Sequence, residues 1–226
     1  MCYHYGLKAN KDKLHKRIPA KNRLEDWSPI FHVNAFSYPM MPVLNASMEW
    51  EWARWGLLPP FVKSSEDVLN MRSKTLNARF ETLTDKASFK QAFSDNRCLI
   101  PATHFMEWQH QNTRKIPYLM EYPQLDIFFF GGLKSDFVHP QTGIRESTFS
   151  IVTTEAISLL ASIHNSKKRK PVVLNNEGET AWLQKAFTAH DLAWAQVPEE
   201  EWTTHILPSN PANWDETNPP AQLELF

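Results

Sequence analysis

The second residue of the chain is a cysteine, and its position gives it chemistry that an internal cysteine lacks. A methionine followed by a small residue is normally removed by an aminopeptidase, which would leave Cys2 as the N-terminal residue. Its α-amine would then have a pKa of about 7.7–8.0, so a fraction of it is neutral near pH 7 and can attack an aldehyde. The neighbouring thiol could close a thiazolidine ring on the resulting imine. Because a Met-Cys start also occurs by chance, this interpretation needs support from the rest of the sequence.

A second group of polar residues lies in the segment 76–82, which contains Asn77 and Arg79. An asparagine amide can orient an amine or a carbonyl group, and a guanidinium fork suits a phosphate. On a strand these two residues would point to the same face. The alternative is a surface Asn and Arg with no function.

A carboxyl group with apolar neighbours occurs at Glu107, which follows Phe105 and Met106 and precedes Trp108. Partial burial would raise the pKa of Glu107 and suit it to general acid–base catalysis. Trp108 could stack on a nucleobase. The alternative is a strand-end glutamate beside a core tryptophan, and Cys98 is interpreted as an ordinary core residue.

A histidine at the end of a helical pattern, His164, precedes the basic run 167–170. Histidine titrates near neutrality, and the basic run provides a local anion-binding patch. The alternative is a helix-end histidine beside a solvated basic turn.

The overall composition does not by itself point to nucleic acid. The chain has 24 basic and 25 acidic residues and a net charge of −1, so a DNA partner would have to be bound by a local basic patch. Two cysteines are too few for a disulfide scaffold, and neither belongs to a Cys-x-x-Cys pair. No apolar run resembles a signal peptide or a membrane span. We therefore expect a cytoplasmic, monomeric protein without metal, cofactor or membrane partner.

The pattern of apolar residues predicts an antiparallel sheet structure with peripheral helices. Alternation at 48–52 predicts a strand, and the basic segment 8–26 predicts a short helix and a turn. Further strands are expected at 97–100, 105–109, 118–121, 127–131, 147–153 and 172–174, and helices at 65–71, 87–95, 155–161, 179–187 and 189–195. We expect one domain over residues 2–207 and a Pro/Asn-rich tail over 208–226.

Four motifs in order resemble the SOS response-associated peptidase family, the abasic-site processing proteins. They are the N-terminal Met-Cys, Asn-Ala-Arg-x-Glu-Thr at 77–82, Arg-Cys-Leu-Ile-Pro at 97–101 with Glu-Trp shortly after, and Ile-His at 163–164 before a basic-Pro segment. Trp-Gly-Leu-Leu-Pro at 55–59 is a further match. The resemblance implies a single α+β domain with an open barrel-like, mainly antiparallel sheet core. It also implies a positively charged groove for single-stranded DNA.

The resemblance assigns roles to particular residues. Cys2 would capture the aldehyde of an opened abasic sugar, and Asn77 would position the amine or the sugar. Glu107 would move protons during imine formation and removal of Met1, while His164 would assist ring opening and release of the cross-link. DNA contacts are expected from Arg79, Trp108, Phe61, Lys86, Arg169 and His4.

The sequence therefore predicts a DNA repair protein that forms a covalent thiazolidine with abasic sites in single-stranded DNA and shields the lesion. One alternative is a single-stranded DNA binding module that acts reversibly. Another is a peptidase acting on other proteins, although no Ser-His-Asp, zinc or Cys-His protease signature is present.

The last five residues carry a separate signal. Gln-Leu-Glu-Leu-Phe at 222–226 resembles the pentapeptide that binds the bacterial sliding clamp. Gln222, Leu223, Leu225 and Phe226 would make the contact, with Leu225 and Phe226 filling an apolar pocket. The alternative is an apolar plug that packs on the domain.

Overall fold

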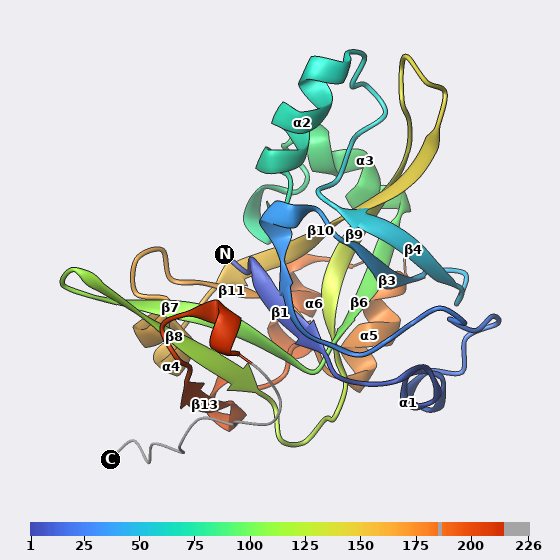
Figure 1. Cartoon of the computed structure of the whole chain (residues 1–226). Coiled ribbons are helices and arrows are strands. Elements are labelled where there is room, and N and C mark those ends of the chain that lie inside the picture. The colour runs from blue at the N-terminus through green and yellow to red at the C-terminus, as the bar shows by residue number, and fades with distance from the viewer. Residues whose placement is uncertain (185–186, 215–226) are drawn as a thin grey trace.

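The strand that follows Cys2 lies inside a sheet and not at its edge (Figure 1). The computed structural model describes residues 1–184 and 187–214. In it, β1 (His4–Leu7) pairs antiparallel with β2 (Ile30–Asn34) on one side and with β7 (His104–Gln111) on the other. The five-stranded sheet has the order β13-β8-β7-β1-β2, with β8 at Arg114–Glu121 and β13 at Thr203–Ile206. Strand pairing on both edges of β1 holds the start of the chain within the fold.

Close packing around β1 requires a glycine at position 6. A Cβ atom there would lie 2.1 Å from the carbonyl oxygen of Phe31 and 2.3 Å from the ring of His104. The flanking Tyr5 and Leu7 are fully buried. The first strand is therefore anchored by its backbone pairing and by its side chains.

The second sheet closes on itself. Its pairings run β10–β4–β3–β6–β9 and return to β10, so these five strands form a ring. They are β3 (Met40–Asn45), β4 (Trp50–Trp55), β6 (Arg97–Ala102), β9 (Phe128–Val138) and β10 (Arg145–Glu155); β5 (Asn77–Arg79), β11 (Arg169–Pro171) and β12 (Val173–Leu174) extend the sheet. Pairing is antiparallel except where β10 meets β4 and β5. The predicted α+β class with a barrel-like, mainly antiparallel core is confirmed.

Aromatic residues fill the space between the two sheets. Phe130 of β9 lies edge-on to Tyr5 and to Phe105, with ring centroids 5.6 and 6.1 Å apart. All three rings are at most 1% exposed. Such edge-to-face contacts add to the free energy gained from burial of apolar surface. The core thus joins β1 to the barrel.

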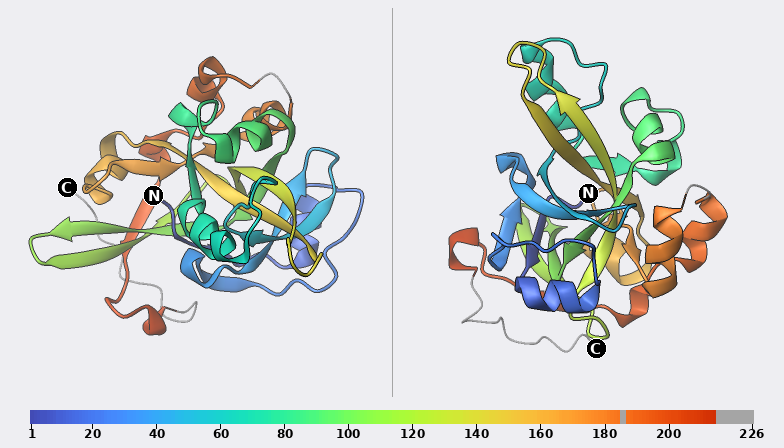
Figure 2. Two further views of the ribbon diagram at one scale, coloured as in Figure 1. Left: turned by 90° about the horizontal axis from the view of Figure 1, so that it is seen from above. Right: turned by 90° about the vertical axis from the view of Figure 1, so that its right-hand side faces the viewer.

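Six helices among the described residues lie around the sheets (Figures 1 and 2). They are α1 (Lys11–Arg17), α2 (Ser65–Lys74), α3 (Ala87–Asp95), α4 (Ser158–Ile163), α5 (Asn176–Leu183) and α6 (Ala189–Trp194), with short 3-10 helices at Ala35–Ser37, Phe80–Thr82, Glu199–Glu201 and Pro211–Asn213. The helix expected at 87–95 is confirmed at both ends. None of the described helices is long and apolar enough to cross a membrane.

Two helix boundaries were wrong. The helix expected from residue 155 begins only at Ser158, because Glu155 still belongs to β10 and the N–H of Ala156 donates to the carbonyl of Lys168. The helix expected from residue 179 begins at Asn176, where the Asn175 side chain caps it by accepting from the N–H of Gly178. Both starts are set by capping and strand contacts that apolar periodicity does not show.

Packing at the C-terminal end reaches beyond residue 207. Trp214 is 7% exposed and lies against His32 and Trp108, with ring centroids 4.8 and 5.7 Å apart. Its indole N–H donates to the carbonyl of Pro208. The described chain therefore stays on the domain up to Trp214. The clamp-type pentapeptide at 222–226 lies outside the described residues.

Candidate functional site

The N-terminal amine is held between two groups that the sequence singled out. The Met1 nitrogen lies 3.0 Å from Nδ1 and 3.2 Å from Nε2 of His164, and 3.6 Å from Oε1 of Glu107. The His164 Nδ1 and Glu107 Oε1 atoms are 3.8 Å apart. Residues 1, 107 and 164 are thus brought together, with Met1 still in place in this structure.

Strand pairing and a helix end bring these groups into contact. His4 of β1 pairs with Met106 of β7, which places the N-terminus beside Glu107. His164 is the residue that ends α4, and its backbone N–H donates to the carbonyl of Leu160. The predicted strand around Glu107 and helix end at His164 are both confirmed.

Glu107 is a buried carboxyl group with a raised pKa. Its pKa is about 7, because burial disfavours the charged form more than the nearby Met1 amine favours it. Near neutral pH the group therefore exists in both its protonated and its ionised form. It can give up or accept a proton under physiological conditions.

His164 is a neutral acceptor. Its Nδ1 lies 2.6 Å from the carbonyl oxygen of Arg169, so Nδ1 carries the proton and donates to that oxygen. Nε2 is then the acceptor of the ring, 3.2 Å from the Met1 nitrogen. Burial, followed by the positive N-terminus, lowers the pKa of His164 to about 4. The ring is uncharged at neutral pH.

Arg169, expected to contact DNA, is tied into the protein. Its two terminal nitrogens donate to the two carboxylate oxygens of Glu81 at 2.9 Å each, and one of them donates to the carbonyl of Thr153 at 2.7 Å. The residue is 8% exposed. This geometry fixes the carbonyl that orients His164 and leaves little of the guanidinium for a phosphate. Glu81 belongs to the Asn-Ala-Arg-x-Glu-Thr motif, but its ion pair with Arg169 could not be predicted from that motif.

The Cys2 thiol is buried and neutral. The residue is 0% exposed, and its Sγ donates to the carbonyl of His4 at 3.8 Å. Burial, and then the charge of Glu107, raises the pKa of the thiol well above its ordinary value. The thiol therefore needs a neighbouring base to lose its proton. Cys98 is also fully buried, on β6.

Asn77 has an unsatisfied side chain. Within the part of the chain that the structure describes, neither its amide oxygen nor its amide nitrogen has a hydrogen-bond partner, and both atoms are buried. Asn77 lies on β5, which pairs parallel with β10 at Ile151. A buried amide without partners costs free energy, and both of its polar atoms are available for further hydrogen bonds. Arg79, two residues along, is exposed and is located on the same face of the strand.

A pocket with a volume of about 400 Å³ opens over Met1, Glu107 and His164, and its lining does not include Cys2, Asn77, Arg79 or Arg169. It is lined by Met1, Tyr3, His4, Glu107, Trp108, His110, Lys115, His164, Ser166 and Lys167. His4 and Trp108, both expected to contact DNA, form one wall, with their rings edge-on at 4.5 Å. Nδ1 of His4 lies 2.8 Å from Nε2 of His32, and burial, followed by His32, lowers the pKa of His4 to about 4. His4 is therefore neutral at pH 7.

Phe61 and Lys86 do not line this pocket. Phe61 is 49% exposed and borders a different depression beside α3, and Lys86 is the exposed residue that precedes α3. The structure does not bring either residue to the N-terminus.

Two aromatic residues near the pocket were not among the site residues expected from the sequence. Tyr3 stacks on Phe36 with ring centroids 4.9 Å apart, and Phe36 is 56% exposed. The position of Tyr3 directly after Cys2 was the available signal. No sequence pattern connects Phe36 with it.

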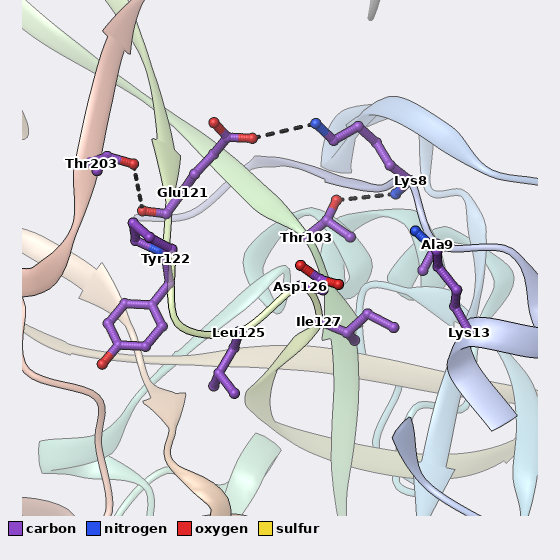
Figure 3. Close-up of a pocket in the computed structure, with 11 residues that line it drawn as sticks. Lys8, Ala9, Lys13, Thr103, Glu121, Tyr122, Leu125, Asp126, Ile127 and Thr203 are labelled. Atoms are coloured by element: carbon purple, nitrogen blue, oxygen red, sulfur yellow. Dashed lines mark hydrogen bonds and ion pairs between the residues drawn. The ribbon is translucent and has the colours of Figure 1, made fainter. Parts of the chain in front are cut away.

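A separate pocket lies beside the ends of β1 and β8 and contains none of the expected site residues (Figure 3). Its lining includes the ion pair between Lys8 and Glu121, at 3.3 Å. The N–H of Lys8 also donates to the Thr103 hydroxyl. We assign no role to this pocket.

The fold and pocket define a protein that presents its own N-terminus to a buried acid–base pair. A family model described as SOS response associated peptidase (SRAP) matches residues 1–209, and the chain belongs to this family.

Three relatives illustrate the similarity. Abasic site processing protein YoqW of Bacillus subtilis (strain 168) is 37% identical over 139 residues, which cover 61% of this chain and 58% of that protein. Abasic site processing protein HMCES of Xenopus tropicalis is 30% identical over 149 residues, covering 58% of this chain and 43% of that protein. A crystal structure of a protein from Bacteroides thetaiotaomicron superposes with a TM-score of 0.86 at 32% identity, covering 92% of each chain. The chain thus spans between two fifths and three fifths of the curated relatives.

The state of His164 can be measured directly. Nitrogen-15 NMR of histidine-labelled protein should show a neutral ring protonated at Nδ1 at pH 7, with protonation of Nε2 only as the pH falls towards about 4. The same result is expected with Met1 retained and after its removal, because burial is the larger cause. A ring protonated at Nε2, or titrating near the ordinary value of about 6.5, would contradict the assignment.

Proposed function

We propose that this protein processes abasic sites in single-stranded DNA by forming a covalent thiazolidine through Cys2. The observation that carries the proposal is the position of the N-terminus, which lies against Glu107 and His164 at the base of a pocket. The unpartnered amide of Asn77 and the names of the relatives support it.

The chemistry begins once Met1 has been removed and the amine belongs to Cys2. The neutral amine attacks the aldehyde carbon of the opened abasic sugar and forms a carbinolamine. Loss of water then yields an imine. The Cys2 sulfur adds to the imine carbon while the thiol proton passes to the nitrogen, closing the five-membered ring. The overall reaction joins amine, thiol and aldehyde and releases one water molecule.

Glu107 and His164 supply the proton transfers. Protonated Glu107 would donate to the departing hydroxyl group, and its ionised form would accept the proton of the buried thiol. Neutral His164 would accept the proton of the anomeric hydroxyl during ring opening and pass a proton to the ring oxygen, which becomes a hydroxyl group. The reverse transfers would assist release of the cross-link. Holding amine, thiol and aldehyde in one pocket makes ring closure effectively intramolecular.

Removal of Met1 would use the same groups. The Met1 amine lies 3.6 Å from Glu107. Glu107 would take a proton from a water molecule that attacks the Met1 carbonyl carbon, and would return it to the Cys2 nitrogen as the peptide bond breaks and methionine leaves. We propose that the protein can perform this step itself. The only peptide bond cleaved in this proposal is the bond between Met1 and Cys2 of the protein itself.

The DNA would be bound through charge and stacking around the pocket. Arg79 would contact a phosphate, and Trp108 and His4 would contact an unstacked base. Phe61 and Lys86 would contact the strand farther from the lesion. We expect the protein to act as a monomer on the nucleoid and to shield the lesion.

A cross-linking assay tests the role of Cys2. A single-stranded oligonucleotide with one uracil should give a shifted band on a denaturing gel only after uracil glycosylase treatment. Cys2→Ala should abolish the band, whereas Cys98→Ala, which removes the other buried thiol, should retain it. Mass spectrometry should place the adduct on a peptide that begins at Cys2.

Reductive trapping separates the amine from the thiol. Cys2→Ala keeps an N-terminal amine, so borohydride should trap its imine although no stable cross-link forms. A shift seen only on native gels would contradict the covalent proposal and favour the reversible DNA-binding module.

The proton-transfer role of Glu107 predicts a particular pH profile. At saturating abasic DNA, the cross-linking rate should fall as the pH rises through about 7, because the protonated form of Glu107 is lost. Glu107→Gln should slow the reaction about 100-fold or more and remove this inflection, with little change in DNA affinity. Glu179 is a matched control, since its buried carboxyl also has a pKa of about 7 and lies on α5 beside Arg17. Wild-type kinetics in Glu107→Gln, or the same loss in Glu179→Gln, would refute the role.

We also propose that the C-terminal pentapeptide binds the bacterial sliding clamp. Pull-down with purified clamp should retain the intact protein and lose it when residues 222–226 are deleted. The double substitution Leu225→Ala/Phe226→Ala should have the same effect, while Glu224→Ala should not. Equal retention of the deletion variant would end the proposal and favour the apolar plug.

A further inference from the structure

The outer rim of the catalytic pocket carries cations that the proposed reaction does not use. His110 and Lys115 come from the β7–β8 hairpin, and Ser166 and Lys167 come from the turn after α4. All four residues are exposed. The hairpin projects from the body of the protein beside the N-terminus (Figure 1).

Hydrogen bonds join the two segments into one rim. The backbone N–H of His110 donates to the Asn165 side chain at 3.0 Å, and the amide nitrogen of Asn165 donates back to the carbonyl of His110 at 2.9 Å. One residue earlier, the Gln109 side chain donates to the carbonyl of Ser162 at 3.1 Å. The hairpin and the turn are therefore held in a fixed relation before any ligand binds.

The two lysines of the rim are unpaired. Four other lysines of the described chain, Lys8, Lys11, Lys134 and Lys170, contact carboxylates, whereas the control lysines Lys16 and Lys90 do not. Within residues 1–184 and 187–214, Lys115 and Lys167 have no carboxylate within 4.0 Å. The only carboxylate among the described pocket-lining residues is Glu107, which is buried.

The rim continues the surface on which a base would stack. Trp108 is opposite Pro117 and His110 is opposite Lys115 in the hairpin, and directly opposed residues of antiparallel strands lie on one face. The aromatic ring and the lysine therefore follow one another along the same face. A nucleic acid strand whose base contacts Trp108 would have its backbone directed towards Lys115.

We propose that Lys115 and Lys167, with the Ser166 hydroxyl, bind a backbone phosphate of single-stranded DNA next to the abasic nucleotide. An ammonium group acts as a compact point charge and a hydroxyl as a donor, a combination that suits the singly charged phosphodiester. This site lies on elements different from that of Arg79, which is on β5. The inference rests on the proposed function, since it assumes that DNA enters this pocket.

The first test measures binding of an intact single-stranded oligonucleotide that has no abasic site. Lys115→Gln/Lys167→Gln should weaken binding and reduce the slope of log affinity against log salt by about 0.7, because the two lysines neutralise one phosphate and each neutralised phosphate of a single strand contributes about 0.7. The control is Lys16→Gln/Lys90→Gln, which removes two exposed lysines from α1 and α3 and should leave the slope unchanged. An unchanged slope in the Lys115/Lys167 variant would overturn the inference.

The second test identifies the phosphate. A series of abasic oligonucleotides would each carry one neutral methylphosphonate linkage near the lesion. For the wild type, one linkage should weaken binding, and the Lys115/Lys167 variant should lose no further affinity at that linkage. Equal losses for wild type and variant at every linkage would overturn the inference. Failure of the proposed function would instead appear as wild-type protein that binds DNA but forms no adduct at Cys2.

Discussion

The site depends on strand pairing at both edges of β1. This strand starts two residues after Cys2 and has β2 on one side and β7 on the other, so the N-terminus is fixed to within a few ångströms of Glu107. A terminus in a chain is ordinarily mobile unless a strand or helix ties it down. Here the central position of β1 converts the chain end into a defined part of the pocket.

Burial then tunes the groups that surround this terminus. The same loss of water raises the pKa of Glu107 to about 7 and lowers that of His164 to about 4, because each group is pushed towards its neutral form. A carboxyl that can carry a proton thus faces an imidazole that can accept one, close to the amine. The pKa values of catalytic acids and bases are commonly shifted by burial in this way.

Several residues around the pocket hold other side chains in position and take no direct part in the proposed reaction. Glu81 holds the guanidinium of Arg169, and the carbonyl of Arg169 accepts the Nδ1 proton of His164. The tautomer of His164 therefore follows from an ion pair between β11 and the 3-10 helix at Phe80–Thr82. On the other wall, Trp214 packs on Trp108, so the C-terminal part of the described chain supports an aromatic surface of the pocket.

The sequence by itself determined part of the fold and proposed the site residues. Apolar patterns predicted the strands now seen as β4, β6 to β10 and β12, and the 87–95 pattern predicted α3, whereas β1, β2, β3 and β13 were not among the expected strands. The motifs around residues 2, 77, 107 and 164 proposed the groups for the chemistry. These signals are local, since each depends on spacing within one short segment. The resemblance to the family added a prediction of the fold class to these local signals.

Only the tertiary structure decided which of these residues meet. It placed Arg169 against Glu81, separated Phe61 and Lys86 from the pocket, and joined the β7–β8 hairpin at His110 to the turn at Asn165. It also anchored Trp214 on the domain, although the surrounding Pro/Asn-rich segment favoured a free tail. Each of these outcomes depends on contacts between residues distant along the chain, which no local spacing encodes. The chemistry of single residues could be predicted from the sequence, but their protonation states depend on burial by the assembled sheets.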